Sequence, residues 1–87
     1  MIILSVVFMV EAYLCVNCVG GMMWEIADAA LKIEGVKMAH AVTGQFDVIA
    51  YIKFANMDKL GKIIEKFMSL NGVQRTQTAV VIPRGLR

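Results

Sequence analysis

The sequence predicts an α+β fold of βαββαβ order, in which two helices cover one face of a four-stranded antiparallel sheet. The main support is an internal repeat. Gly35-Val36 follows a helix-like segment, and Gly72-Val73 follows another one 37 residues later (72 − 35). The same shift places the apolar segment 9–17 on 46–54. The halves 9–45 and 46–82 therefore both read strand, helix, glycine, strand, and two such halves form the ferredoxin-like arrangement.

The two predicted helices, 22–33 and 57–70, repeat their apolar residues with a helical period of about 3.6. The apolar face of the first comprises Met23, Ile26, Ala27, Ala30 and Leu31, and its polar face Glu25, Asp28 and Lys32. The second carries Leu60, Ile63, Ile64, Phe67 and Leu70 at equivalent spacing. Asn56 suits the N-cap and Asp58 the first turn of that helix, while a glycine after each helix suits its C-terminus.

The strand predicted at 46–54 is apolar on both faces. Ile49 and Tyr51 point to one side, and the other side carries Phe46, Val48, Ala50, Ile52 and Phe54. Two helices can cover only one face of the sheet, so the second face requires a partner, most simply another sheet. The composition agrees, since 59% of the chain is hydrophobic and only 18% is charged. We therefore expect a homodimer of the dimeric α+β barrel type.

Length and charge limit the remaining possibilities. The 87 residues allow one domain, expected at 9–82, with 1–8 an N-terminal extension or the result of an ambiguous start site and 83–87 a tail. A spanning helix needs about 20 apolar residues, and Glu11 interrupts the apolar start after about ten, so we expect no membrane partner. The net charge of +2 includes no run of basic residues, which argues against direct nucleic-acid binding. Two closely spaced cysteines fit a reducing, cytoplasmic location.

A hairpin sequence between the second and third strands, VTGQFDVIA at 42–50, is the most specific feature. Taken alone it predicts an ordinary turn, with Gly44 at positive φ and Asp47 bonded locally. In context, 10–82 resembles the effector-sensing (RAM) domain of the Lrp/AsnC family of amino-acid-responsive regulators. The other segments that carry this resemblance are Val10-Glu11-Ala12-Tyr13, Ile33-Glu34-Gly35-Val36 and Gly72-Val73-Gln74-Arg75-Thr76-Gln77-Thr78.

The resemblance implies a sheet-to-sheet dimer, ring-like assemblies of dimers, and a small amino-acid effector bound between dimers. It implies no cofactor and no metal. The residues that it assigns to the effector site are Thr43, Gly44, Gln45, Phe46, Asp47, Thr76 and Thr78. A glycine allows main-chain N–H groups to approach a carboxylate, and an aspartate can hold an ammonium. Ordinary turn formation and β-propensity are the alternative for these residues. Gln45 occupies a position that varies in the family, and Phe46 replaces a more usual tyrosine.

Full-length members of that family carry a helix-turn-helix domain before this one, whereas only eight or nine residues precede the first predicted strand. The resemblance therefore implies the stand-alone form, which senses amino acids or modulates full-length Lrp/AsnC regulators by co-assembly, and which is not an enzyme.

Two other functions remain open. Heavy-metal-associated chaperones share the βαββαβ plan and carry a C-x-x-C motif, which Cys15-Val16-Asn17-Cys18 matches. If residues 15–18 form a strand, however, the thiols point to opposite faces and cannot hold one ion. Small dimeric α+β barrel enzymes also share the architecture. Their acid–base chemistry would fall to His40, which is the only histidine and has no acidic sequence neighbour.

Overall fold

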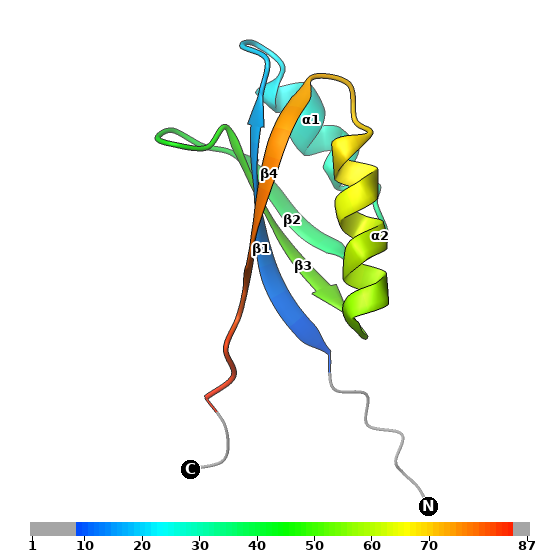
Figure 1. The fold of residues 1–87 in the computed structure, drawn as a ribbon. Helices are drawn as coiled ribbons and strands as arrows, with labels where there is room; N and C mark the ends of the chain where they lie inside the picture. The colour runs from blue at the N-terminus through cyan, green and yellow to red at the C-terminus, as the bar shows by residue number, and fades with distance from the viewer. Residues whose placement is uncertain (1–8, 85–87) are drawn as a thin grey trace, which may run out of the picture.

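The secondary-structure elements follow one another in the predicted βαββαβ order (Figure 1). The structure, a computed structural model, describes residues 9–84. Its elements are β1 (Val10–Cys18), α1 (Met23–Ala30), β2 (Val36–Ala41), β3 (Val48–Phe54), α2 (Met57–Met68) and β4 (Val73–Val80). The predicted fold class is confirmed. The predicted extension at 1–8 lies outside the described residues, as does most of the predicted tail.

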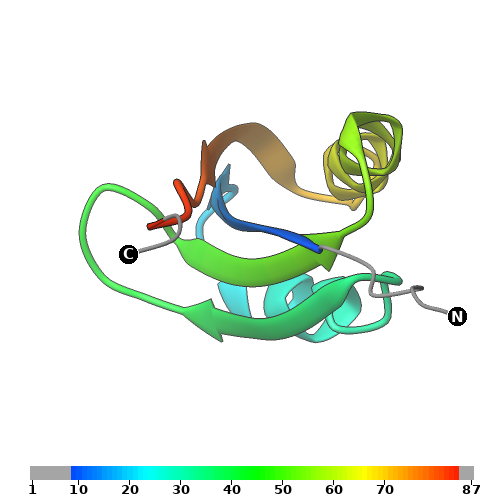
Figure 2. The same ribbon diagram turned by 90° about the horizontal axis from the view of Figure 1, so that it is seen from below.

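The four strands form one sheet in the order β2-β3-β1-β4, and every neighbouring pair is antiparallel. β1 and β3 are central, and β1 pairs with β3 from Val10↔Phe54 to Val16↔Val48. Both helices lie on the same side of this sheet, and no other element within 9–84 covers its opposite side (Figures 1 and 2). The expectation of one helix-covered face and one open face is therefore confirmed.

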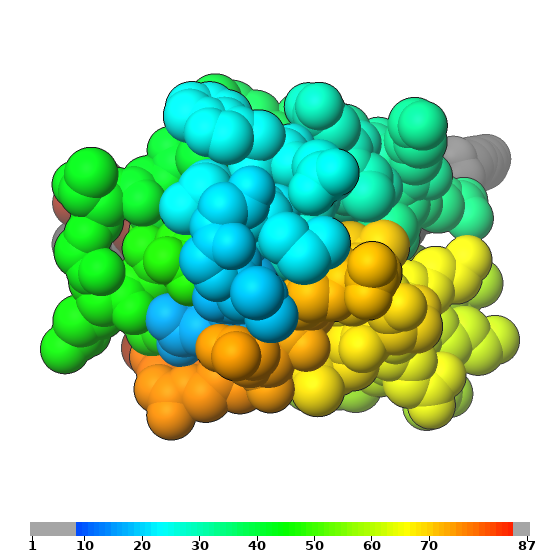
Figure 3. All heavy atoms as spheres, turned by 90° about the horizontal axis from the view of Figure 1, so that it is seen from above, coloured from blue at the N-terminus to red at the C-terminus, as the bar shows by residue number. Residues whose placement is uncertain are grey.

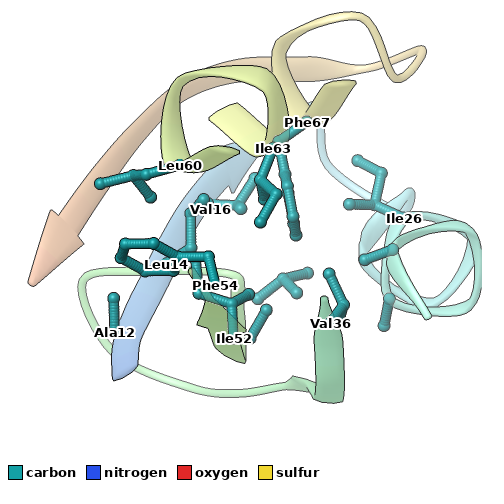
Figure 4. Packing of buried hydrophobic residues seen from close by; sticks show 14 of the residues in the cluster. Ala12, Leu14, Val16, Ile26, Val36, Ile52, Phe54, Leu60, Ile63 and Phe67 are labelled. Carbon is teal, nitrogen blue, oxygen red and sulfur yellow. The ribbon is translucent and has the colours of Figure 1, made fainter. Parts of the chain in front are cut away.

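The core lies between the sheet and the two helices (Figure 4). Alternation along the central strands directs Ala12, Leu14 and Val16 of β1 toward the helices, and likewise Val48, Ala50, Ile52 and Phe54 of β3. The buried helix residues that pack against them are Ile26, Ala27 and Ala30 of α1 and Leu60, Ile63 and Phe67 of α2. Each large side chain buried in this way stabilises the fold by about 1.5–3 kcal/mol.

Helix boundaries differ from the sequence prediction. Leu31 N still bonds four residues back to Ala27 O, but α1 ends at Ala30 because the next amides bond only three residues back, Lys32 N to Ala29 O and Ile33 N to Ala30 O. Leu31 is consequently 49% exposed and does not join the core, contrary to the prediction. α2 ends at Met68 in the same manner, with Leu70 N bonded to Phe67 O. The predicted cap is confirmed, since Asn56 Oδ1 accepts from Lys59 N at 3.0 Å.

Candidate functional site

The hairpin 42–47 joins β2 to β3 and projects away from the helices (Figures 1 and 3). Its neck is closed by Val42 N donating to Asp47 O at 2.9 Å, so β3 begins at Val48 and not at the predicted Phe46. Thr43, Gly44 and Gln45 are exposed, while Phe46 and Asp47 are half-buried. Gly44 adopts φ +108°, the left-handed conformation that the turn prediction required.

The hairpin tip offers unused donors. Within residues 9–84 the main-chain N–H groups of Thr43, Gly44 and Gln45 donate to no other group. A Cβ built on Gly44 would meet no atom within 4 Å, so its positive φ is the feature that calls for glycine. An exposed turn with free N–H groups is suited to receive a carboxylate.

Asp47 ties the hairpin to the end of β1. Its main-chain N–H donates to Val16 O at 2.8 Å, and its Oδ2 accepts from the Cys18 main-chain N–H at 2.8 Å. The predicted local bond of Asp47 is thus a contact across 29 residues of sequence. Within 9–84 the other oxygen, Oδ1, makes no hydrogen bond and remains available to a cation.

Asn17 and Arg75 were not predicted as site residues, yet they extend this network to β4. Asn17 Nδ2 donates to Gln45 O at 2.7 Å, and Arg75 Nε donates to Asn17 Oδ1 at 3.2 Å. These bonds join a strand end, a hairpin and the edge strand. A polar residue at the end of the apolar strand VEAYLCVNC is the one sequence signal that could have indicated Asn17.

Thr76 and Thr78 lie on β4, at an edge of the sheet. They pair with Val16 and Leu14 of β1, so both face the helix side and are half-buried. The prediction that they share one face is confirmed. Within residues 9–84 no hydrogen bond joins either hydroxyl to the hairpin, which leaves the sheet on its other side (Figure 1). A single chain therefore does not bring all seven predicted residues into one cavity.

The open face of the sheet carries an aromatic pair. Tyr13 of β1 and Tyr51 of β3 are cross-strand neighbours with ring centroids 5.3 Å apart, and Tyr13 is 44% exposed. The Tyr51 hydroxyl donates to Glu11 Oε1, and this bond, with burial and the negative charge of Glu11, raises the pKa of Tyr51 to about 12. Ile49 and the exposed Met38 lie on the same face.

The cysteines do not form a chelating pair. Both belong to β1, where Cys18 joins the core on the helix side and Cys15 lies on the opposite face. Burial raises the pKa of both thiols, and the carboxylate of Asp47 raises that of Cys18 further, which disfavours the thiolate that binds metal. No cluster of three or more potential ligands occurs in the described part of the chain.

An enzymatic role for the lone histidine gains no support from the geometry. His40 is exposed on β2 opposite Ile49, with no carboxylate bonded to it within 9–84. Among the described helices, neither is long and apolar enough to cross a membrane.

The fold is shared by several classes of protein, and comparison with known proteins gives the family. The family model for the Lrp/AsnC ligand binding domain matches residues 11–84, and this chain belongs to that family.

Relatives by sequence are helix-turn-helix-type transcriptional regulators. One from Pyrococcus furiosus is 40% identical over 57 residues, which cover 64% of this chain and 38% of the relative. The regulator LysM from Sulfurisphaera tokodaii is 31% identical over 58 residues, 67% of this chain and 41% of the relative. The chain thus matches less than half the length of these relatives.

Solved structures share the fold. A protein from Thermus thermophilus superimposes with a TM-score of 0.82 at 23% identity, over 90% of this chain and 99% of that one. AsnC from E. coli gives a TM-score of 0.74 at 20% identity, over 90% and 54%. A transcriptional regulator from Neisseria meningitidis, solved in complex with L-Met, gives 0.75 at 22% identity, over 90% and 53%.

Proposed function

We propose that this chain is a self-associating regulatory domain that binds a free amino acid at the 42–47 hairpin, and that it does not act as an enzyme. The observation that carries the proposal is the hairpin, which presents three free N–H groups and one free carboxylate oxygen while hydrogen bonds from β1 hold it in place. Membership of a ligand-binding family supports it, as does the bound L-Met in the Neisseria regulator.

A free amino acid offers a carboxylate and an ammonium, and the hairpin offers a complement to each. The N–H groups of Thr43, Gly44 and Gln45 receive the carboxylate, while Asp47 Oδ1 receives the ammonium. Both contacts are charge-assisted hydrogen bonds, which are stronger than neutral ones. Phe46, half-buried at the base of the hairpin, supplies an apolar contact for the side chain of the ligand.

Assembly completes the site in this proposal. Thr76 and Thr78 face the helix side of the sheet and make no hydrogen bond to the hairpin of their own chain, so in this proposal they serve the hairpin of a neighbouring copy. Contact through the open faces, centred on Tyr13 and Tyr51, builds the dimer, and dimers then bring hairpins and β4 edges together. An oligomer of this kind can also incorporate a longer relative through the same surfaces.

A screen of the twenty amino acids by thermal shift, followed by calorimetry, tests the proposal. We expect one or a few ligands with dissociation constants on the order of micromolar to millimolar. Gly44→Val should abolish binding, because a β-branched residue is strained at φ +108° and shields the neighbouring N–H groups. Thr78→Val should weaken binding by roughly 0.5–1.5 kcal/mol, since one hydroxyl is lost without a change of shape.

Gly20→Val is the matched control for the hairpin variant. Gly20 has no positive φ, and a Cβ there meets nothing within 4 Å, so this variant should bind like the wild type. If no amino acid binds, or if Gly44→Val binds as well as Gly20→Val, the proposed sensing function is wrong.

A further inference from the structure

A second concave feature lies at the other end of the β2–β3 pair, about 20 Å from the hairpin along β3. It is a pocket of about 300 Å³ between the corner at Glu34 and Gly35, the end of β3 and the side of α2. Its exposed apolar lining comes from Met9 and Ala55, while Phe54 and Ile63 lie beneath it in the core. The amino-acid site proposed above shares no residue with this pocket.

Lysines dominate the lining of this pocket. Five of the six lysines in the chain line it, namely Lys37, Lys53, Lys59, Lys62 and Lys66. The one carboxylate among the lining residues is that of Glu34. Lys53 alternates with Ile52 and Phe54, which point to the helices, so its side chain points to the open face of the sheet. The other four lysines and Glu34 leave a net charge of +3 around the pocket, whereas the whole chain carries +2. The positive charge of the molecule is thus concentrated here.

Three of the pocket-lining lysines belong to α2. Lys59, Lys62 and Lys66 are spaced i, i+3 and i+7, so the three ammonium groups lie close together on α2, and Asp58 and Glu65 flank Lys62 at i−4 and i+3. No salt bridge to a carboxylate relieves any of the pocket lysines within residues 9–84. An anion bound between the three ammonium groups would offset the repulsion among them.

We propose that this pocket binds a small compound that carries a di- or triphosphate group. The three α2 lysines extend over about 10 Å of helix, so a ligand with several connected negative charges neutralises them better than a single carboxylate does. The exposed side chains of Met9 and Ala55 accommodate an uncharged portion, such as a nucleoside base. The ligand class is therefore nucleotide-like.

Shape favours a small molecule over a nucleic-acid backbone. The Glu34–Gly35 corner, β3 and α2 line a half-open pocket, whereas duplex DNA is contacted by an extended basic surface. The basic residues outside the pocket within 9–84 are Lys32, Arg75 and Arg84, and Arg75 is engaged with Asn17 near the hairpin. They do not extend the pocket into a basic stripe.

Calorimetric titration of the whole chain with ATP, pyrophosphate, adenosine and a short duplex DNA tests this proposal. ATP should bind, pyrophosphate should bind more weakly, and adenosine should not bind measurably. Lys62→Glu should weaken ATP binding about tenfold or more, because a nearby charge is reversed. Lys32→Glu makes the same charge change outside the pocket and should leave the affinity within about twofold.

The stability of the Lys62→Glu variant provides an independent readout. The new carboxylate gains Lys59 and Lys66 as neighbours of opposite charge and Asp58 and Glu65 as neighbours of like charge, so the melting temperature should stay close to that of the wild type while ATP affinity falls. The proposal is overturned if ATP fails to bind, if both charge reversals act equally, or if only DNA binds. The Gly44→Val protein should retain ATP binding, so this result and that of the amino-acid screen can be told apart.

Discussion

At the junction of β1 with the hairpin, the two carboxylate oxygens of Asp47 have different roles. Oδ2 accepts the Cys18 main-chain N–H and fixes the hairpin, and Oδ1 is left for the ammonium of the proposed ligand. Asn17 adds a second attachment through Gln45 O. A free amino acid can then bind to a hairpin that is already ordered, which reduces the entropic cost of binding.

Tyr51 gives a residue-scale prediction on the open face. Its hydrogen bond to Glu11 holds the phenol protonated and raises its pKa to about 12, so the stabilisation is present below about pH 10 and lost as pH rises through 12. In a Tyr13→Phe protein, where Tyr51 is the remaining tyrosine, tyrosinate absorbance should develop with a midpoint near 12. Adding Glu11→Gln should lower that midpoint toward 10. An unchanged midpoint would contradict the assigned contact.

At the scale of elements, substitution by alanine should stabilise the protein at one glycine and destabilise it at another. Gly61 lies inside α2, where a Cβ would meet no atom within 4 Å. Gly61→Ala should therefore raise the free energy of unfolding by about 0.5–1 kcal/mol through helix propensity. Gly35 has φ +97°, and its Cβ would lie 2.9 Å from Lys53 O. Gly35→Ala should cost about 1–3 kcal/mol. Urea denaturation measures both, and equal effects of the two alanines would refute this assignment.

The period of the apolar residues predicts the helices and strands because the buried residues of each element lie on one of its faces. Ile26, Ile63 and Phe67 occupy the core positions that the helical pattern assigned to them, and Val48, Ala50 and Ile52 those of the strand pattern. Helix ends were predicted less well, because the final turns of α1 and α2 tighten to three-residue bonds that no apolar period records. Leu31 is the clearest consequence, since it falls just beyond the last α-helical turn.

Some features of the candidate site could likewise be predicted from the sequence, and others could not. A turn with Gly44 at positive φ follows from local chemistry, and the shared face of Thr76 and Thr78 follows from strand alternation. The contacts of Asp47 with Cys18 and of Asn17 with Arg75 could not be predicted, because they depend on which strands pair across 29 and 58 residues of sequence. These bonds are fixed by how distant strands pair with one another, which the pattern of apolar residues does not show.

At the scale of the whole molecule, the uncovered sheet face is the feature with the largest consequence. Tyr13 and Met38 are 44% and 48% exposed there, beside Ile49 and Tyr51. A domain of 87 residues hides only about 60–65% of its unfolded surface, so it gains considerably from association. Homodimer formation and ring-like assembly are what we predict from this uncovered face.

Sedimentation analysis at micromolar concentration tests the central claim most directly, because the proposed amino-acid site is completed only by assembly. We predict that no folded monomer is detected, that the smallest species is a dimer, and that the amino acid found in the screen shifts the distribution of larger assemblies. The Gly44→Val protein should form the same dimer but show no such shift. A single folded species of 9.6 kDa, unchanged by any amino acid, would contradict both the dimer and the sensing function.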